Sequence, residues 1–219
     1  MRTNKANENT GNDYYNIDVS IEESLVKGGL IDDLFYLKDL KQRKLFLNMD
    51  IDQFSVEDIV KHIMQINKED KGIEPSERAP ILLYVTSNGG EVDSGFELID
   101  VIMSSQTPVY TINLGYQYSM GFLIGLAGHK RYATRNAKFL MHDGSNFVRD
   151  SGMKAQDRMD FQKKIEARIR QYVISRSNVT EEEYDSKLRV EWYMFADEAK
   201  ERGFVDYILG EDCNISEIV

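Results

Sequence analysis

The chain has 219 residues, which suits one domain with an appended arm, and its hydrophobic content of 42% and charged content of 29% are ordinary for a globular protein. The net charge of −10 argues against nucleic acid as the main partner, because phosphate binding needs a basic surface. A single cysteine, Cys213, excludes an internal disulfide framework and a Cys-rich zinc site, and it favours a reducing, cytoplasmic setting. No apolar run reaches the roughly 20 residues that span a bilayer, so a membrane protein is not expected.

The chain divides into four stretches by composition. Residues 1–20 are polar and are expected to form a disordered tail that also lacks the apolar core of a secretory signal. Residues 21–43 mix charged and apolar side chains and predict short helices or an arm. The compact domain is expected over residues 44–210, followed by a short tail at 211–219.

Strands and helices are expected to alternate along the compact domain. The first expected elements are a strand at 44–48, a helix at 55–66 with Ser55 as its N-cap, a strand at 81–86, a helix marked by Val92 to Met103, and a strand at 109–114. A helix at 120–128 and strands at 131–133 and 138–142 are expected next. The last expected elements are a long charged helix at 157–176, a short helix opened by a Thr180–Glu183 capping box, a helix at 196–202 and a strand at 205–209. This alternation predicts an α/β fold with mostly parallel strands.

The run 115–121 (GYQYSMG) carries the first chemical signal, because it places Ser119 between an apolar strand and a helix start. Free N–H groups at a helix start support a nucleophilic hydroxyl and a developing oxyanion. Considered alone, such a serine more often serves as a small residue that lets a helix pack closely on a sheet. A catalytic serine also needs a base within hydrogen-bond reach.

Only three histidines are available as that base. His62 falls within an amphipathic helix, where a surface or core role is expected, and His129 follows a glycine in a turn that predicts a helix C-cap. His142 closes a predicted strand, and ligand-facing side chains gather at the carboxyl ends of parallel strands. His142 is therefore the candidate base, with a hydrogen-bonded core histidine as the alternative.

The pair Gly89-Gly90 follows a predicted buried strand. Two glycines let backbone N–H groups face a ligand without a blocking side chain. Together with the N–H of Met120 beside Ser119, such a group would form an oxyanion hole. The alternative is a plain turn into the next helix.

Taken together, these segments resemble a known family. The runs 115–121, 131–143 and 192–209, with 40–47 and 81–90, are similar to ClpP, the proteolytic subunit of the ATP-dependent Clp protease, in the same order over roughly residues 40–210. The resemblance implies an α/β spiral of β-β-α units, of the kind shared by ClpP and crotonases, with a protruding handle helix at about 155–176.

The resemblance also implies roles for individual residues. Ser119 matches the nucleophile, His142 the general base, and Gly90 and Met120 the backbone oxyanion donors. Glu191 stands where the family has the aspartate of the triad, and its side chain is one methylene longer. Glutamate serves as the triad acid in other hydrolases.

Two rival acids and one bulky neighbour bear on these roles. Asp185 and Asp143 are the alternatives to Glu191 as the triad acid. Tyr118 replaces a small residue of the family beside the serine, which predicts a narrower site.

The implied activity is that of a serine endopeptidase acting on unfolded proteins inside a chamber built from two heptameric rings, a tetradecamer of this chain. Substrate peptides would lie as an added strand beside residues 89–92 and 144–147. The chain lacks a GxxxxGK[ST] phosphate loop, so ATP would be used by a partner AAA+ unfoldase. No metal or organic cofactor is expected, and neither nucleic acid nor membrane is expected as a partner.

Three alternatives stay open. The first is a weakly active or inactive ring subunit that regulates a paralogue, suggested by Glu191 and Tyr118. The second is a crotonase-fold acyl-CoA enzyme, which would rely on glutamates and two backbone N–H groups. The third is a phage-type or processing protease on the same fold, suggested by the unfamiliar N-terminal region.

Overall fold

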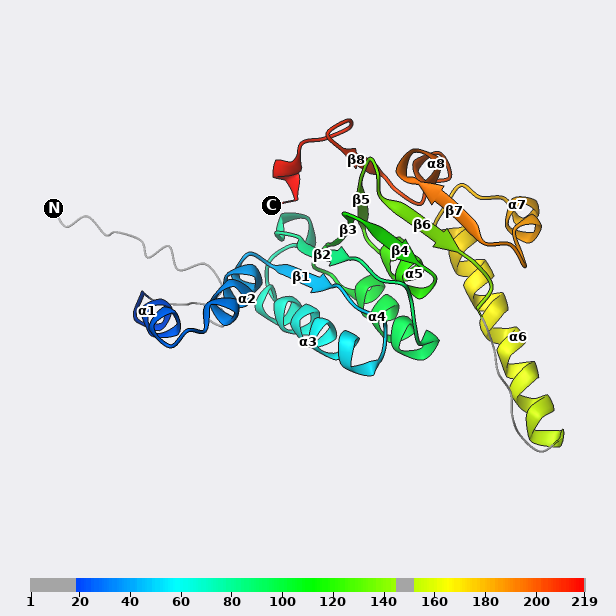
Figure 1. Cartoon of the computed structure of the whole chain (residues 1–219), viewed down its shortest axis with the longest axis horizontal. Coiled ribbons are helices and arrows are strands. Elements are labelled where there is room, and N and C mark those ends of the chain that lie inside the picture. The colour runs from blue at the N-terminus through cyan, green and yellow to red at the C-terminus, as the bar shows by residue number, and fades with distance from the viewer. Residues whose placement is uncertain (1–18, 145–151, 219) are drawn as a thin grey trace.

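The computed structural model of the chain describes residues 19–144 and 152–218. Its centre is a sheet of five parallel strands in the order β1-β2-β3-β5-β8 (Figure 1). The strands are β1 (Lys44–Leu47), β2 (Ile81–Val85), β3 (Val109–Asn113), β5 (Lys130–Thr134) and β8 (Tyr207–Leu209). Every residue of β2 is buried, as a continuous apolar run in a parallel sheet requires. The predicted α/β class and mostly parallel strands are confirmed.

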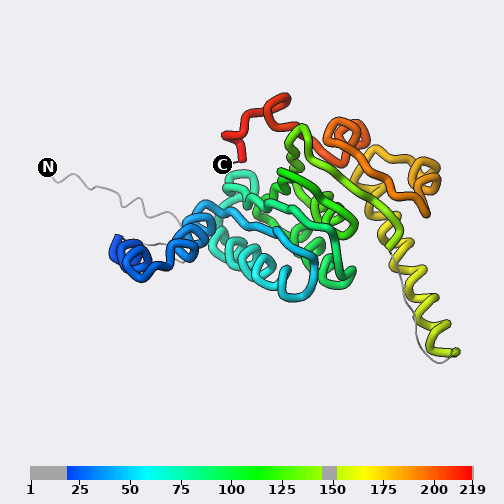
Figure 2. Tube along the Cα trace, viewed as in Figure 1, coloured from blue at the N-terminus to red at the C-terminus, as the bar shows by residue number. Residues whose placement is uncertain are grey.

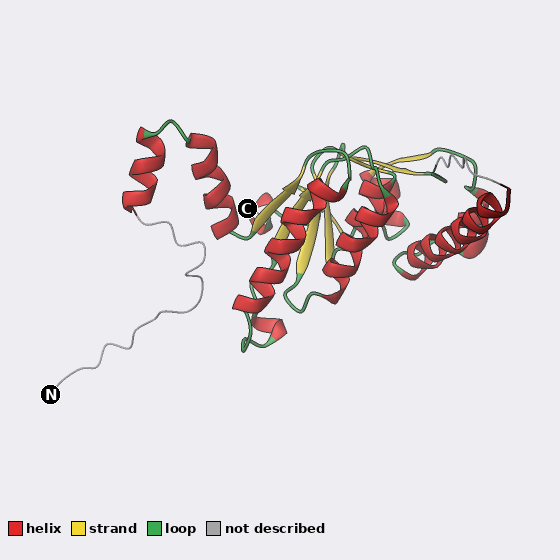
Figure 3. Ribbon diagram, turned by 90° about the horizontal axis from the view of Figure 1, so that it is seen from below, coloured by secondary structure: helices red, strands yellow, loops and turns green. Residues whose placement is uncertain are grey.

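Three helices cover one face of this sheet (Figure 3). They are α3 (Gln53–Glu69), α4 (Val92–Ser104) and α5 (Met120–Leu126). The prediction of Ser55 as the N-cap of α3 was wrong. Asp52 is the cap: its carboxylate accepts from the N–H of Ser55, whose hydroxyl in turn accepts from the N–H of Asp52. The capping box begins the helix two residues earlier than expected.

A second sheet of three strands lies beside the first, in the order β4-β6-β7. Its strands are β4 (Tyr116–Tyr118), β6 (Lys138–Met141) and β7 (Trp192–Phe195). β4 runs parallel to β6, and β7 runs antiparallel to it. The sequence analysis anticipated β6 but neither β4 nor β7.

The face of the five-stranded sheet opposite the helices is covered by the C-terminal segment. This segment leaves β8, turns through a 3-10 helix (Ile215–Glu217) and returns over the strands. Ile218 is buried there against Tyr84, whose hydroxyl donates to the Ile218 carbonyl. A second 3-10 helix (Pro75–Glu77) precedes β2.

Helix α6 (Gly152–Ser175) projects from the body as a long rod, as Figures 1 and 2 show. A helix was expected from Asp157, and the observed one begins earlier. At its base, Val173 is buried and Ile169 packs on the core. Along the projecting half, Met153 and Phe161 are 86% and 62% exposed. Only the C-terminal part of α6 therefore packs on the body.

The base of α6 is joined to α5 by Arg176. Its guanidinium donates to the carbonyls of Leu126, Ala127 and Gly128 at distances of 2.6–3.2 Å. These are carbonyls of the last turn of α5 and its C-cap region, which have no partner within the helix. A cation at the C-terminal end of a helix is also electrostatically favourable.

Two short helices lie between α6 and the end of the fold. α7 (Glu181–Ser186) begins at Thr180, whose hydroxyl accepts from the N–H of Glu183. The expected reciprocal contact of the capping box is replaced, because the Glu183 carboxylate accepts from Arg202 instead. α8 (Ala196–Glu201) follows β7 and ends before Gly203, which has φ +70°.

Residues 19–41 form two helices, α1 (Val19–Lys27) and α2 (Ile31–Lys41), at the end of the molecule away from α6 (Figures 1 and 3). The prediction of short helices in this stretch is confirmed. α2 buries Leu34 and Leu40, and its Tyr36 hydroxyl bonds the ring of His62 on α3 at 3.0 Å.

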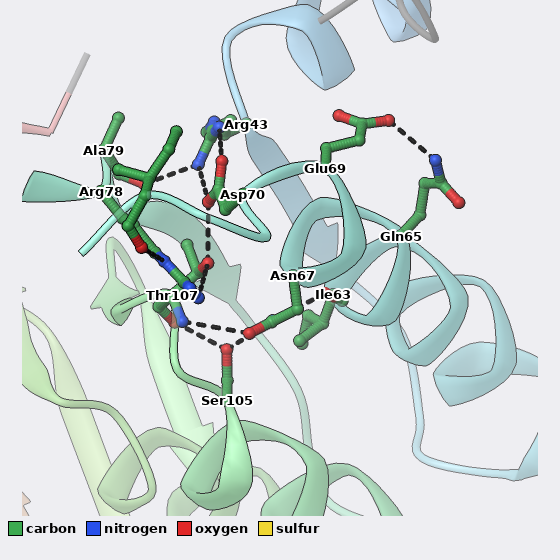
Figure 4. Close-up of polar contacts among 11 residues, drawn as sticks. Arg43, Ile63, Gln65, Asn67, Glu69, Asp70, Arg78, Ala79, Ser105 and Thr107 are labelled. Atoms are coloured by element: carbon green, nitrogen blue, oxygen red, sulfur yellow. Dashed lines mark hydrogen bonds and ion pairs between the residues drawn. The ribbon is translucent and has the colours of Figure 1, made fainter. Parts of the chain in front are cut away.

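A buried polar network ties the start of the sheet to α3 (Figure 4). Asp70, at the end of α3, is 2% exposed and accepts two bonds from the Arg43 guanidinium, at 2.6 and 2.7 Å, and one from the Thr107 hydroxyl, at 2.7 Å. Burial alone would raise the pKa of Asp70, but these bonds and the nearby arginine charges outweigh it and hold the pKa below its usual range.

Candidate active site

Ser119 lies at a strained junction between β4 and α5. Its backbone has φ 53° and ψ −120°, a region that favours glycine and costs a serine about 1–3 kcal/mol. The turn is fixed by the Ser119 N–H, which donates to the carbonyl of Leu140 on β6 at 2.9 Å. A serine on a strained strand-to-helix turn is the arrangement that exposes a nucleophilic hydroxyl at the edge of a sheet. Ser119 is half-buried, which leaves a path for a substrate.

The glycine loop after β2 meets this turn through its first glycine. A Cβ atom on Gly89 would lie 2.6 Å from the Cβ of Ser119 and 3.1 Å from the nitrogen of Met120, so only glycine fits. Gly90 instead packs on Ile51, where a Cβ would lie 2.1 Å from the carbonyl oxygen. The loop therefore touches both the serine turn and the strand-like segment at Ile51.

The two predicted oxyanion donors have N–H groups outside the regular hydrogen-bond ladders. Ile51 pairs with the loop by donating to the carbonyl of Gly89 and accepting from the N–H of Glu91, both at 2.8 Å, so the N–H of Gly90 takes no part in this bridge. Met120 is the first residue of α5, and a helix provides no acceptor for the N–H at that position. Among residues 19–144 and 152–218, neither N–H group is used in these ladders.

The register of the three-stranded sheet brings Ser119, His142 and Glu191 to the same end. Ser119 follows the last residue of β4, and His142 follows the last residue of β6. β7 enters from the opposite direction, with Trp192 opposite Met141. Neither Glu191 nor His142 belongs to the ladder, but continuing its register by one step would set them opposite each other. Residues directly opposite in an antiparallel pair have their side chains on one face, about 5 Å apart at Cβ.

The two rival acids are engaged elsewhere. The carboxylate of Asp185 accepts two bonds from Arg170 on α6, at 2.8 and 2.9 Å, and these bonds hold its pKa below the usual range. Asp143 is exposed and follows His142 directly, so an extended chain turns its side chain to the opposite face. The pKa of Tyr184 is raised mainly by its burial, and the charge of Asp143 adds to this rise. Neither is placed opposite His142 by the register.

The other two histidines have structural contacts. His62 bonds Tyr36, as the expected surface or core role implies. The prediction of His129 as a helix C-cap was wrong, because its ring bonds the backbone of Val109 at the start of β3, with 3.1 Å between Nδ1 and the Val109 nitrogen. Burial lowers the pKa of both imidazoles.

Sequence reasoning missed an aromatic face next to the candidate triad. Tyr118 and Tyr193 lie on either side of Leu140 in the sheet register, and their rings meet edge to face with centroids 5.9 Å apart. Tyr116 continues the row, 5.1 Å from the ring of Tyr118. The run 192–195 (WYMF) is rich in aromatic residues, which are common in strands, and this composition was the available signal. Its alternation of buried and exposed side chains appears only in the structure.

Other predictions for the site fall partly outside the described residues. The expected peptide-binding strand at 144–147 includes Ser145, Asn146 and Phe147, which the structure does not describe. Within residues 19–144 and 152–218, no cluster of three His, Cys, Asp or Glu side chains is arranged to hold a metal ion. In the same described ranges, no helix combines the length and apolar character that crossing a membrane requires.

Comparison with known proteins places this geometry in context. The family model described as Clp protease matches residues 30–212. The chain is also similar to the ATP-dependent Clp protease proteolytic subunit 2 of Treponema pallidum (strain Nichols), with 28% identity over 178 residues, which cover 80% of this chain and 86% of the relative. The family-model match includes all the strands of both sheets.

Proposed function

The chain belongs to the Clp protease family, and on this premise we propose that it is a serine endopeptidase in which Ser119, His142 and Glu191 form the catalytic triad. The observation that carries the proposal is their convergence at one end of the three-stranded sheet, with the serine on a strained turn. The free N–H groups beside the serine support the same reaction class.

The proposed reaction follows from these positions. The Ser119 oxygen attacks the scissile carbonyl carbon while His142 accepts the hydroxyl proton. The negative charge that develops on the carbonyl oxygen is stabilised by the N–H groups of Met120 and Gly90. His142 returns its proton to the leaving amine, which departs and leaves an acyl-enzyme on Ser119. Water, deprotonated by His142, then attacks the acyl carbon and releases the second product.

Glu191 is the proposed acid that orients the imidazole and stabilises its protonated form. The β6–β7 register supports this role, because it sets Glu191 opposite His142 and gives Asp185 and Asp143 no such position. The reaction needs neither a metal nor an organic cofactor.

Assembly into rings around a chamber is also part of the proposal. The projecting half of α6 exposes the apolar side chains Met153, Met159 and Phe161, which an assembly would cover. The relative from Treponema pallidum is named as a proteolytic subunit of an ATP-dependent protease. We therefore propose that this chain acts in the cytoplasm as a homo-oligomer, a tetradecamer of two stacked rings, on unfolded polypeptides delivered by an AAA+ ATPase.

Replacing Ser119 by alanine tests the function directly. The variant should lose at least about a thousandfold in kcat on a fluorogenic peptide, because the nucleophile is gone, while its elution volume in size-exclusion chromatography is unchanged. A fluorophosphonate should label the wild type at Ser119, mapped by mass spectrometry, and should not label the variant.

Ser104→Ala is the matched control, since Ser104 is an exposed helical serine that bonds only backbone carbonyls of α4. It should keep wild-type turnover and labelling. Equal hydrolysis by wild type and Ser119→Ala would refute the serine mechanism. A wild type that assembles but neither hydrolyses the peptide nor reacts with the fluorophosphonate would instead identify an inactive ring subunit.

A further inference from the structure

A row of apolar side chains crosses all five strands of the parallel sheet on the face opposite its helices. The strand registers pair Phe46 with Tyr84, Tyr84 with Ile112, Ile112 with Tyr132, and Tyr132 with Tyr207. The rings are stacked at both ends of this cross-strand row, with 4.7 Å between the centroids of Phe46 and Tyr84 and 5.1 Å between those of Tyr132 and Tyr207. Parallel sheets normally have both faces covered, so this row needs a cover.

Residues 214–218, here called the C-terminal strap, cover part of the cross-strand row (Figure 1). Ile218 is 1% exposed and belongs to the same apolar cluster as Tyr84 and Tyr132. The Tyr84 hydroxyl also donates to the carbonyl of Ile218. Phe46, at the edge of the sheet, stays 44% exposed. The strap thus closes the interior of the row and leaves one end of it open to solvent.

The C-terminal strap has few contacts with the body besides those of Ile218. Residues 214–217 are exposed. Its two backbone bonds, from the N–H groups of Glu217 and Ile218 to the carbonyls of Asn214 and Ile215, lie within the strap itself. Among residues 19–144 and 152–218, the bond from Tyr84 is the one hydrogen bond that joins the strap to the rest of the chain. A single side chain and a single hydrogen bond therefore anchor its far end.

The turn that precedes the strap is held more firmly. The Gly210 N–H donates to the Cys213 carbonyl at 2.8 Å. The Asp212 carboxylate accepts from the Ile208 N–H at 2.6 Å and from the ammonium group of Lys200. The boundary between a fixed turn and a lightly held strap thus lies after Cys213.

The closed strap is held by a small number of opposing contributions. Closure buries one isoleucine side chain and forms one hydrogen bond, and both favour the closed state. It also orders several residues that remain exposed, and each ordered residue loses conformational entropy. A segment with so few buried contacts opens locally at a lower free energy than the strands beneath it.

We propose that the C-terminal strap is a releasable cover, which closes over the cross-strand row through Ile218 and opens without unfolding of the sheet. In the closed state the chain occupies its own apolar face, so another apolar group binds there only after displacing Ile218. Opening joins Tyr84 and Tyr132 to the exposed ring of Phe46 in one apolar surface. The inference goes beyond the proposed function, since no residue of the candidate triad takes part in it.

Matched substitutions within the strap of the full-length protein test the proposal. Ile218→Asp places a charge against the apolar row and should release the strap. Ile215→Asp makes the same change at a side chain that is 63% exposed, and it should leave the strap closed. Two probes report the state of the strap. One is the rate at which DTNB reacts with Cys213, the single cysteine, which packs on the same apolar cluster as Ile218. The other is the fluorescence of bis-ANS, a dye that binds exposed apolar surface.

The expected effects differ in size. Ile218→Asp should raise the DTNB rate at Cys213 by at least about tenfold, because the buried isoleucine no longer favours closure, and should increase bis-ANS fluorescence. Tyr84→Phe keeps the ring and removes only the hydrogen bond, so it should raise the DTNB rate about threefold. Ile215→Asp should match the wild type with both probes. All three variants should keep the thermal unfolding midpoint within about 5 °C of the wild type, because the sheet stays folded.

Three results would overturn the proposal. Equal DTNB rates and bis-ANS fluorescence in Ile218→Asp and Ile215→Asp would show that Ile218 does not hold the strap. A wild type whose Cys213 reacts as fast as it does in urea-unfolded protein would show that the strap is not closed. An Ile218→Asp protein that fails to fold, or whose unfolding midpoint falls beyond the stated limit, would show that the segment is part of the core rather than a releasable cover.

Discussion

The two sheets of this chain differ in what they bury and in what they expose. The five-stranded sheet is parallel throughout, and β2 at its interior has no exposed residue. The three-stranded sheet has one buried face, while its other face carries Tyr118, Tyr193 and Phe195 and ends at the candidate triad. Packing is concentrated in the first sheet, and the proposed site lies at the edge of the second.

The two sheets meet at Ser87, which bonds both β4 and the glycine loop. Ser87 follows β2 by two residues and bridges to Gln117 in the middle of β4. Its N–H donates to the Tyr116 carbonyl, its carbonyl accepts from the Tyr118 N–H, and its hydroxyl accepts from the Gly89 N–H. A single buried serine therefore sets the glycine loop and the Ser119 turn relative to each other.

The same contrast separates two carboxylates. Asp70 is buried and accepts from two partners, Arg43 and Thr107, and its role is to hold β1, α3 and β3 together. Glu191 is exposed and lies just before β7. The buried carboxylate has its partners within the fold, whereas the proposed triad acid is open to solvent.

The largest expected effect would separate chemistry from stability. Replacing His142 by alanine should lower kcat by at least about a thousandfold, because the general base is removed, and should leave the thermal unfolding midpoint unchanged. His129→Ala, in the five-stranded sheet, should do the reverse: it removes the ring contact to Val109 and should lower the unfolding midpoint while kcat below that temperature is retained. If both variants lost kcat and thermal stability together, the contrast between the two sheets would be refuted.

A smaller effect, on stability alone, is expected from Asp70→Asn. Removing the charge opposite Arg43 should lower the free energy of unfolding by about 2–3 kcal/mol at pH 7, measured by urea denaturation at fixed protein concentration. Because the folded pKa of Asp70 is lowered, its contribution is fully present above the unfolded pKa of about 3.9 and is lost as the pH falls through the folded value. The difference between wild type and variant should therefore shrink below pH 4, and a constant difference would contradict the assignment.

The smallest effect is expected from Asp185→Asn. Asp185 pairs with Arg170 at the surface, and exposed pairs contribute little, so kcat should stay within about twofold of the wild type. This variant tests which residue is the triad acid, because Glu191→Gln should lower kcat far more than Asp185→Asn. A large loss from Asp185→Asn with little from Glu191→Gln would reassign the triad acid, as kinetics on a fluorogenic peptide would reveal.

Much of the fold could be predicted because its elements have strong periodicity. The apolar runs that became β2 and β3 have the composition of buried parallel strands, and α4 has regular helical spacing. β4 was missed because its three residues lie inside a motif whose glycines indicate a turn. β7 was missed because its four residues are all apolar or aromatic and show no alternation with polar residues.

The candidate site was predictable at the level of residue types but not of contacts. Ser119 and His142 follow from strand ends, and Glu191 follows only from the family resemblance. No local pattern indicates that Gly89, rather than Gly90, touches the serine turn, because that contact depends on how Ile51 bridges the loop. The contact between Tyr118 and Tyr193 depends on the register of β6 and β7, which pairs residues more than fifty positions apart.

Arg176 joins the base of α6 to α5, the helix that begins at the Ser119 turn. α5 has seven residues and is therefore a strut of about 10 Å, with Ser119 at one end and the Arg176 guanidinium at the other. So short a helix has no internal hinge, and Tyr172 bonds its middle through the Leu123 carbonyl at 2.9 Å. If α6 tilts relative to the body, it must either move α5 and Ser119 as well or first break these hydrogen bonds.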